Sequence, residues 1–536
     1  MPPASAQPRR AAMSSLAVAA GILLSRFAGL VRQRIFARYL GLSPAADAFT
    51  AALRIPNFLQ NLFGEGILSG SFIPVYAKLL AQGDEATAGR VASITVSLLT
   101  LAVGATTLIG MLCAPLIVAL LAPGFQGEVR ALTTTLVRIM FPGVGLLALS
   151  AWCLGILNSH RRFFISYVAP VLWNAAIVAT LLCFGRTLAG SATGQFELAI
   201  WVGWGTVAGA LLQLALLLPT SVSLLRHGRS RLRPELSLAL PPVRTVLRNF
   251  LPMLLSRGVL QVSAFIDQAL ATLIGSGANA AMAYAQMIYL VPVSLFGMSV
   301  SAAELPEMSG ASGTPEEVAA QLRQRLTSGL GRIAFFVVPS VAAFLMLGDL
   351  IVALLFQTGT FQHDDTVFVW MILAGSALGL LASTQSRLFS SACYALHDAR
   401  TPLRYALVRV ALTTLLGAAA TLAARLGWWS PQLGTAGLTA SAGLAGWFEF
   451  VLLARALRQK IGPFSVGGRD LVKLWAAALF AVAAGSALRF APLPHPLVRG
   501  LVILGSYGAV YLLATLGLAV PEARATATRL FLRRRK

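Results

Sequence analysis

The sequence is poor in charged residues, and acidic residues are especially few. Only 11% of its 536 residues are charged, with 19 Asp and Glu against 42 Lys and Arg, whereas a soluble globular domain has about 25% charged residues. Hydrophobic residues make up 57% of the chain, and the mean hydropathy is +0.76. No polar region is long enough for a soluble domain, so the composition indicates a polytopic membrane protein.

Cysteine and histidine are also scarce. The four cysteines are scattered through apolar segments and the five histidines are dispersed, without the spacing of a disulfide framework or a zinc site. No glycine loop for phosphate, pair of catalytic carboxylates or nucleophile elbow stands in a supporting context. We therefore expect no metal, no cofactor, no catalytic residues and no enzymatic activity.

Long apolar runs dominate what is present. A membrane-spanning helix needs about 20 mostly apolar residues. The sequence predicts about fourteen such helices, at approximate positions 15–40, 47–77, 91–121, 131–157, 164–186, 198–225, 243–273, 278–304, 328–356, 366–392, 403–424, 434–457, 471–489 and 498–518.

The basic residues are distributed unevenly between the loops. A net charge of +23 would suit a nucleic-acid partner, but most Lys and Arg lie in alternate short loops between apolar spans. The positive-inside rule places those loops in the cytoplasm. We therefore expect no nucleic-acid partner, and a multi-pass topology with both termini in the cytoplasm.

The two halves of the chain repeat short motifs. LLSR at Leu23–Arg26 recurs at Leu254–Arg257, LFG at Leu62–Gly64 recurs at Leu295–Gly297, and Ile73-Pro74 is matched by Leu305-Pro306. The offsets are 231, 233 and 232 residues, so all three matches hold one register. An offset of six spans preserves topology and predicts parallel repeats that bind substrate between them.

This repeat predicts the domain organisation. The fold class is an all-α polytopic membrane protein, with two six-helix parallel repeats plus two C-terminal helices. Within Gly310–Thr327 we expect a short interfacial helix with an N-cap at Thr314, acting as a surface connector. The expected parts are a cytoplasmic lead 1–14, an N-terminal lobe 15–225, a cytoplasmic linker 226–242, a C-terminal lobe 243–457, and helices 13 and 14 with a basic tail 458–536.

Charged residues within the spans are the candidate functional residues. An ionisable side chain at membrane depth costs at least roughly 2.5–3.5 kcal/mol on insertion scales, so it usually has a function. In the first span Gly21, Ser25, Ala28 and Arg32 share a face suited to a close helix contact or a cavity wall, and Arg26 lies about 100° away.

Arginines outnumber acids in the first two spans. A guanidinium surplus in a cavity favours an anion, and its planar fork suits phosphate. The alternative is structural pairing, of Arg32 with Asp47 or of Arg54 with Glu65. The predicted substrate-binding cavity residues are Ser25, Arg26, Arg32, Arg54, Asn61 and Arg257.

Asp267 is a separate acid within span 7, beside Ser263 and Gln268. Two roles stay open for it. It coordinates a coupling ion such as Na⁺ or H⁺, or it hydrogen-bonds a neighbouring helix.

At these residues the chain resembles the MurJ/MviN lipid II flippases of the multidrug/oligosaccharidyl-lipid/polysaccharide (MOP) exporter superfamily. The matching stretches are LLSRFAGLVRQRIFARYLG, ADAFTAALRIPNFLQNLFGEGILSGSFIPVYAKLL, LPEMS at Leu305–Ser309 and CYALHDARTPL at Cys393–Leu403. With the fourteen predicted spans and the repeat, the resemblance extends over nearly the whole chain.

The resemblance implies two six-helix lobes around a cationic cavity, with helices 13 and 14 forming a groove for a lipid tail. It implies that the chain exports undecaprenyl-pyrophosphate-linked peptidoglycan precursor (lipid II) across the cytoplasmic (inner) membrane by alternating access, driven by Na⁺, H⁺ or the membrane potential. Its partners would be this anionic lipid, the bilayer and cell-wall synthesis proteins.

The resemblance also assigns roles to individual residues. Arg26 and Arg32 match the two cavity arginines of span 1, and Asp267 corresponds loosely to an ion-binding acid of sodium-coupled members. The charges expected to have structural or gating roles are Asp47, Glu65 and Asp398.

The chain departs from the family pattern at several cavity positions. Gln33 replaces an acid, Gln60-Asn61 stand where an arginine is usual, and Tyr284–Pro292 reads YAQMIYLVP instead of YADRLxEFP. Arg54 and Arg257 are candidates to restore the missing charge. The alternative functions are export of another lipid-linked oligosaccharide or of a drug, or a non-transporting scaffold for cell-wall enzymes.

Overall fold

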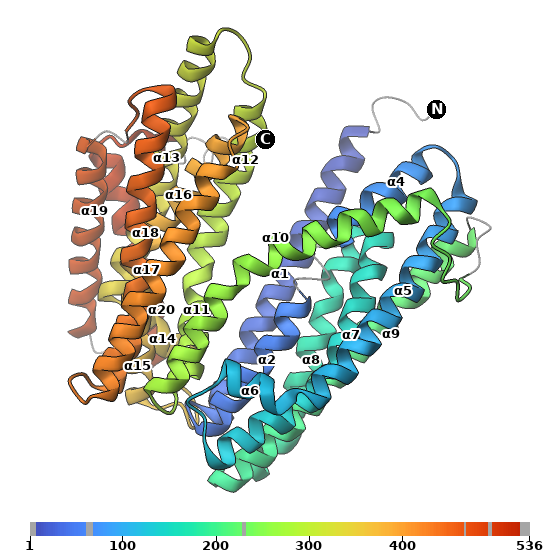
Figure 1. Cartoon of the computed structure of the whole chain (residues 1–536). Coiled ribbons are helices and arrows are strands. Elements are labelled where there is room, and N and C mark those ends of the chain that lie inside the picture. The colour runs from blue at the N-terminus through green and yellow to red at the C-terminus, as the bar shows by residue number, and fades with distance from the viewer. Residues whose placement is uncertain (1–6, 61–67, 228–231, 466–467, 491–495, 526–536) are drawn as a thin grey trace. The chain divides into compact units, whose positions relative to one another are not determined.

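The fold is seen in a computed structural model of the whole chain (Figure 1), in which residues 7–60, 68–227, 232–465, 468–490 and 496–525 are described. These residues form helices joined by short loops, with no strand among them. Ten described helices are long and apolar enough to cross a membrane, or eleven if one bent pair forms a single span. The predicted all-α polytopic fold is confirmed, and the total of fourteen spans stays a prediction.

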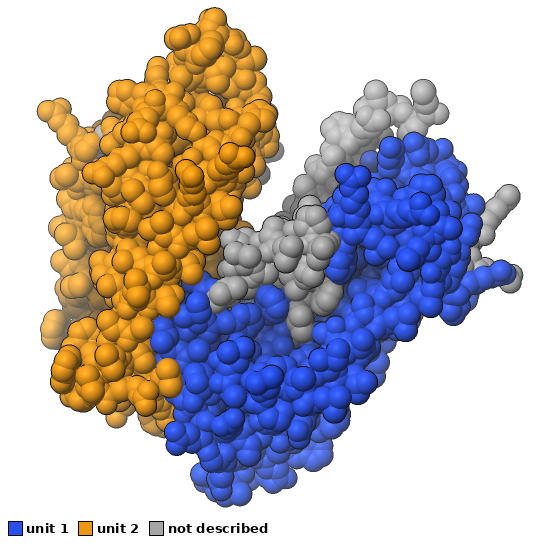
Figure 2. Space-filling view, in the orientation of Figure 1, with its two compact units in different colours: residues 1–272, 358–361 blue, residues 273–357, 362–536 orange. Residues whose placement is uncertain are grey.

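The chain divides into two compact units (Figure 2). Unit 1 comprises Met1–Thr272 with Thr358–Phe361, and unit 2 comprises Leu273–Gln357 with Gln362–Lys536. The predicted lobe boundaries divide the chain differently and stay predictions.

Unit 1 contains the first ten helices, the last of which ends two residues beyond it. They are α1 (Gln7–Leu40), α2 (Pro44–Gln60), α3 (Ser69–Ser71), α4 (Ile73–Ala81), α5 (Glu85–Leu112), α6 (Ala114–Leu121), α7 (Gly127–Ser159), α8 (Phe163–Leu188), α9 (Ala192–His227) and α10 (Pro241–Ile274).

The helix at the centre of unit 1 is α7. It packs against α2, α5 and α9, and 67% of its apolar window is buried, against 28% for α5 and for α9. Trp152 and Ile156 of α7 are fully buried with Phe72, Tyr76 and Ile94. A helix that is apolar on all sides but mostly exposed is suited to face lipid, and α5 and α9 have this character.

Unit 2 contains the remaining elements. They are α11 (Ala278–Pro292), the π-helix η3 (Val293–Met298), α12 (Ser299–Ser309), α13 (Pro315–Met346), α14 (Gly348–Phe356), α15 (His363–Ala377), α16 (Leu380–Ala395), α17 (Arg400–Arg425), α18 (Pro431–Ile461), α19 (Gly468–Ala487), the 3₁₀ turn η4 (Leu488–Phe490) and α20 (Pro496–Gly517).

Within unit 2, α13 has the central position and α16 crosses α18 closely. The apolar window of α13 is 67% buried. At the break between α15 and α16, a Cβ on Gly379 would lie 2.2 Å from Cα of Gly443 in α18. Membrane helices approach this closely only through small residues, so this pair of glycines sets how near the start of α16 and α18 can lie.

The expected short interfacial helix after Gly310 is wrong. The N-cap is where the sequence predicts it, because Thr314 and Glu317 form a reciprocal capping box. The helix that starts there continues without a break to Met346 as α13. The polar PEEVAAQLRQRL segment is therefore the first part of a long span, since no helix-ending residue separates it from the apolar part.

Helix α20 is attached to α13 by two tyrosines. Pro339 lacks an N–H, so the carbonyl of Phe335 one turn earlier loses its helical donor. The hydroxyl of Tyr511 donates to that carbonyl at 2.6 Å, and Tyr507 donates to the carbonyl of Pro339 at 2.7 Å. The freed backbone acceptor inside the membrane region is thus satisfied from a neighbouring helix.

The LFG motif of the second half lies in irregular helix. Leu295–Gly297 falls within the π-helix η3, between α11 and α12. Its first-half counterpart, Leu62–Gly64, lies outside the described residues. Because π-bulges are rare and frequently mark functional positions, the irregular segment between α11 and α12 that contains this motif is a candidate functional position.

Candidate functional site

The small-residue face predicted for the first span packs against α8. A Cβ on Gly21 would lie 2.7 Å from Cβ of Tyr167, so the helices are in close contact there. Eleven residues later on this face, the guanidinium of Arg32 lies over the ring of Trp173, 5.1 Å from its centroid. This cation–π contact holds the charge at the interface between α1 and α8.

Arg26 has a different setting. It is exposed, whereas Ser25 and Arg32 are half-buried. About 100° of rotation separates consecutive residues on a helix, so Arg26 lies beside the packed face rather than on it. The two predicted anion contacts therefore have different surroundings: Arg32 lies over an aromatic ring, and Arg26 is exposed.

Asp47 is buried at the start of α2. Its side chain lies in the first turn, and the residue is only 1% exposed. Its backbone N–H donates to the carbonyl of Ser43 at 3.1 Å, and the Ser43 hydroxyl accepts from the N–H of Ala46. An acidic side chain is stabilised near a helix N-terminus, which is where Asp47 lies.

Arg54 lies beside Asp267. The carboxylate of Asp267 on α10 attracts the guanidinium of Arg54 on α2. The same two helices are joined by an edge-to-face contact of Phe58 with Phe265, whose ring centroids are 5.1 Å apart. One of the two candidate cavity charges outside span 1 is therefore attracted to an acid.

The remaining predicted residues cannot be placed in the same detail. Asn61 and Glu65 lie outside the described residues. Arg257 lies on the helical backbone of α10, and its side chain is outside the described part. The pairing of Arg54 with Glu65 stays a prediction.

Asp398 anchors the loop between α16 and α17. Its carboxylate accepts the backbone N–H groups of Arg400 and Thr401 at 3.1 and 3.0 Å and forms an ion pair with Lys460 of α18. The Lys460 ammonium, with the donors of Thr401, holds the pKa of Asp398 well below its ordinary value. These contacts are those of a loop anchor.

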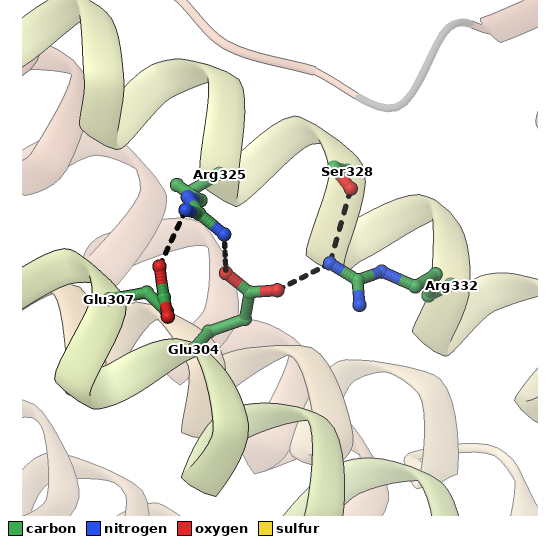
Figure 3. Close-up of polar contacts among 5 residues, drawn as sticks. All are labelled: Glu304, Glu307, Arg325, Ser328 and Arg332. Carbon is green, nitrogen blue, oxygen red and sulfur yellow. Dashed lines mark hydrogen bonds and ion pairs between the residues drawn. The ribbon is translucent and has the colours of Figure 1, made fainter.

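A charge cluster joining α12 and α13 was not anticipated from the sequence (Figure 3). Glu304 is 3% exposed and forms ion pairs with Arg332 and, at 3.8 Å, with Arg325. Arg325 also forms an ion pair with Glu307, at 2.6 Å. Ser328 accepts from Arg332 at 3.2 Å. Arg325, Ser328 and Arg332 of α13 follow i, i+3, i+7 spacing, so the sequence alone would have placed them on one face of the helix.

A cavity of about 400 Å³ adjoins this cluster, lined by residues of α12 and α13 that include Glu307, Arg325 and Arg332. Glu304 and Glu307 balance the two arginines. The cluster is therefore suited to hold α12, which follows the π-helix, against α13.

A second unanticipated pair lies deeper in unit 2. Arg409 of α17 and Glu449 of α18 form an ion pair of 3.1 Å, and Glu449 is 7% exposed. These residues lie forty positions apart in the sequence, on different helices. Their sequence signal was only the presence of single charges within apolar spans.

Comparison with known proteins identifies the family. The family described as "Lipid II flippase MurJ" matches residues 36–506. A relative from Rhizobium meliloti, named probable lipid II flippase MurJ, is 32% identical over 82% of this chain and 79% of its own length. A lipid II flippase MurJ from Burkholderia cenocepacia is 30% identical over 83% of each chain.

Solved structures agree on the fold. A structure of lipid II flippase MurJ in an inward closed conformation has a TM-score of 0.75 at 22% identity, over 93% of this chain and 97% of that one. An inward-facing multidrug resistance transporter of the MATE family has a TM-score of 0.64 at 16% identity, over 82% and 94%. From the match over most of its length and these relatives, the chain belongs to the MurJ lipid II flippase family.

Proposed function

We propose that this chain moves lipid II across the cytoplasmic membrane, from the inner to the outer leaflet. The family match over residues 36–506 carries the proposal. The membrane arginines support it, because a pyrophosphate-linked lipid presents an anion that guanidinium groups bind well. Arg26 and Arg32 contact the pyrophosphate while the two repeats alternate access. No observation favours a different lipid-linked sugar, a drug or a scaffold role.

The topology and the energy source belong to the same proposal. Both termini lie in the cytoplasm, as the basic loops indicate. Either Asp267 contributes to coupling with Na⁺ or H⁺, or the membrane potential drives transport. The electrostatic attraction between Asp267 and Arg54 supports the first alternative, because Arg54 is a predicted cavity residue. Cell-wall synthesis proteins are the expected protein partners.

Complementation tests the function. A bacterial strain depleted of its own lipid II flippase should regain growth when this chain is expressed. Expression and membrane insertion are checked by immunoblotting of membrane fractions. Absence of rescue despite normal insertion would overturn the assignment of lipid II as the cargo.

A further inference from the structure

Helix α16 carries a polar stripe that the proposed site does not use. Ser383, Arg387, Ser390 and Tyr394 follow i, i+4, i+7 and i+11 spacing, which places them on one face of the helix. Arg387 and Tyr394 are exposed and the two serines are half-buried, while most other residues of α16 are buried. The exposed side chains of α16, Arg387 and Tyr394, therefore lie on a polar stripe.

This stripe lies at membrane depth. With α15, α16 forms a bent pair that is apolar enough to count as one span. Arg387 lies eight residues before the helix end at Ala395, which is about 12 Å along the axis. A charged residue at such depth usually faces a water-filled cavity or the interior of the bundle rather than lipid. An exposed arginine there indicates a solvated surface.

Four helices of unit 2 contribute to the surroundings of Arg387. One turn before it, Ser383 hydrogen-bonds the hydroxyl of Tyr289 from α11 at 3.0 Å. Arg387 also interacts electrostatically with Tyr289, and with both members of the Arg409–Glu449 ion pair. Tyr394 interacts with the same carboxylate. Two guanidinium groups thus share one carboxylate, which leaves the cluster with a net positive charge.

The donors of Arg387 are not used within the described residues. The structure gives it neither a hydrogen bond nor an ion pair there, although it is close enough to Glu449 for electrostatic attraction. An arginine that fastens helices in the same unit behaves differently: Arg489 holds both oxygens of Asp349, at 2.8 and 3.0 Å. A structural role would use the guanidinium fork of Arg387 in the same way.

We propose that the α16 stripe is a phosphate-type anion site, in which Arg387 and the hydroxyl of Tyr394 contact the anion and Arg409, oriented by Glu449, adds positive charge. A guanidinium with free donors at membrane depth binds phosphate oxygens strongly, because such hydrogen bonds are charge-assisted. The identification of this anion as the pyrophosphate of the lipid-linked substrate rests on the proposed function. The presence of an anion site is independent of that function.

Binding measurements on the purified full chain in nanodiscs test the site. The probes are undecaprenyl pyrophosphate, inorganic pyrophosphate and undecaprenol, which lacks the anion. We expect Arg387→Gln to weaken pyrophosphate binding roughly ten-fold or more, since charge-assisted hydrogen bonds contribute about 1.5–3 kcal/mol. Arg387→Lys should retain part of the affinity, and undecaprenol binding should not change.

A matched control removes the same charge elsewhere in unit 2. Arg425, exposed in the last turn of α17, is changed to Gln and should leave all three affinities unchanged. Unaltered thermal unfolding of Arg387→Gln shows that the variant is folded. Loss of undecaprenyl pyrophosphate binding identifies a lipid headgroup as the ligand, and loss confined to inorganic pyrophosphate identifies a soluble anion; either supports the site.

Two results would overturn the proposal. One is equal affinity of Arg387→Gln and the unaltered chain for both anions, and the other is no measurable affinity of the unaltered chain for either. Rescue of a flippase-depleted strain is scored separately with the unaltered chain. Failure of the anion site and failure of the flippase assignment are therefore distinguishable.

Discussion

The two units carry their membrane charges on different helices and hold them differently. In unit 1 the charges lie on α1, α2 and α10, where Arg32 rests on the ring of Trp173 and Arg54 lies near Asp267. In unit 2 they lie on α12, α13 and α16–α18, where Glu304 and Glu449 form close ion pairs with arginines. The two units therefore hold their membrane charges by different contacts.

The repeat register shows where the halves diverge. Asp47 corresponds to Asn279, 232 residues later, and both are buried near the start of a helix, at 1% and 2% exposure. Arg54 corresponds to Gln286, which is exposed and neutral. The buried polar position at the helix start thus recurs, while the positive charge of Arg54 does not.

The largest expected effect is loss of transport when the span 1 arginines are removed. Arg26→Ala and Arg32→Ala should each abolish rescue of a flippase-depleted strain, because each removes a contact that we propose to the pyrophosphate. Arg130→Ala, at an exposed arginine in the first turn of α7, is the control and should rescue normally. Full activity of both span 1 variants would contradict the proposed role of Arg26 and Arg32 in binding the substrate.

A smaller effect is expected from the charge cluster of unit 2. Glu304→Gln leaves two arginines without their shared partner, which should lower the free energy of unfolding by about 2 kcal/mol, a value reduced from that of a fully buried pair because both arginines are partly exposed. Glu307→Gln, whose side chain is 57% exposed, should change it by less than about 0.5 kcal/mol. Thermal unfolding in detergent measures both, and equal effects would refute the clamp between α12 and α13.

Weakening the attachment of α20 to α13 should lower the free energy of unfolding by about 1 kcal/mol. Tyr511→Phe removes the donor to the Phe335 carbonyl that Pro339 leaves without a helical partner. Tyr405→Phe is the comparison, because no described residue hydrogen-bonds the Tyr405 hydroxyl. The unfolding midpoints of the two variants are compared with that of the unaltered chain. A midpoint for Tyr511→Phe equal to that of Tyr405→Phe would contradict the account.

The smallest expected effect is on the pH dependence of stability, through His160 in unit 1. Burial lowers the pKa of His160 below its ordinary value, opposed by Glu85 and reinforced by Arg162, and the ring lies 3.1 Å from the hydroxyl of Tyr76. The folded chain therefore disfavours the protonated ring. Its contribution to stability is complete above about pH 6.5 and is lost as the pH falls through the lower folded pKa.

His160→Gln removes this titration. Between pH 7.5 and 5.5 the unaltered chain should lose slightly more stability than the variant, by less than about 1 kcal/mol because the ring is partly exposed. Thermal unfolding at the two pH values measures the difference. An identical pH dependence of the two proteins would show that His160 does not contribute.

The sequence predicted the helical membrane fold, the N-cap at Thr314 and the packed face containing Gly21 and Arg32, because these depend on composition and spacing within one helix. It did not predict the pairing of Glu304 with Arg332 or of Arg409 with Glu449. Such pairs depend on how neighbouring helices are rotated, which spacing along one helix does not specify. The stripe around Arg387 could have been found by applying the same spacing test to the tenth span.

Translocation of lipid II is the most direct test of the central claim. In flippase-depleted cells expressing this chain, an externally added enzyme that cleaves lipid II at the outer leaflet should release product at a rate well above that of cells without the chain. The Arg26→Ala, Arg32→Ala double variant should give only the background rate. Background release by the unaltered chain, present in the membrane at normal amounts, would contradict the account.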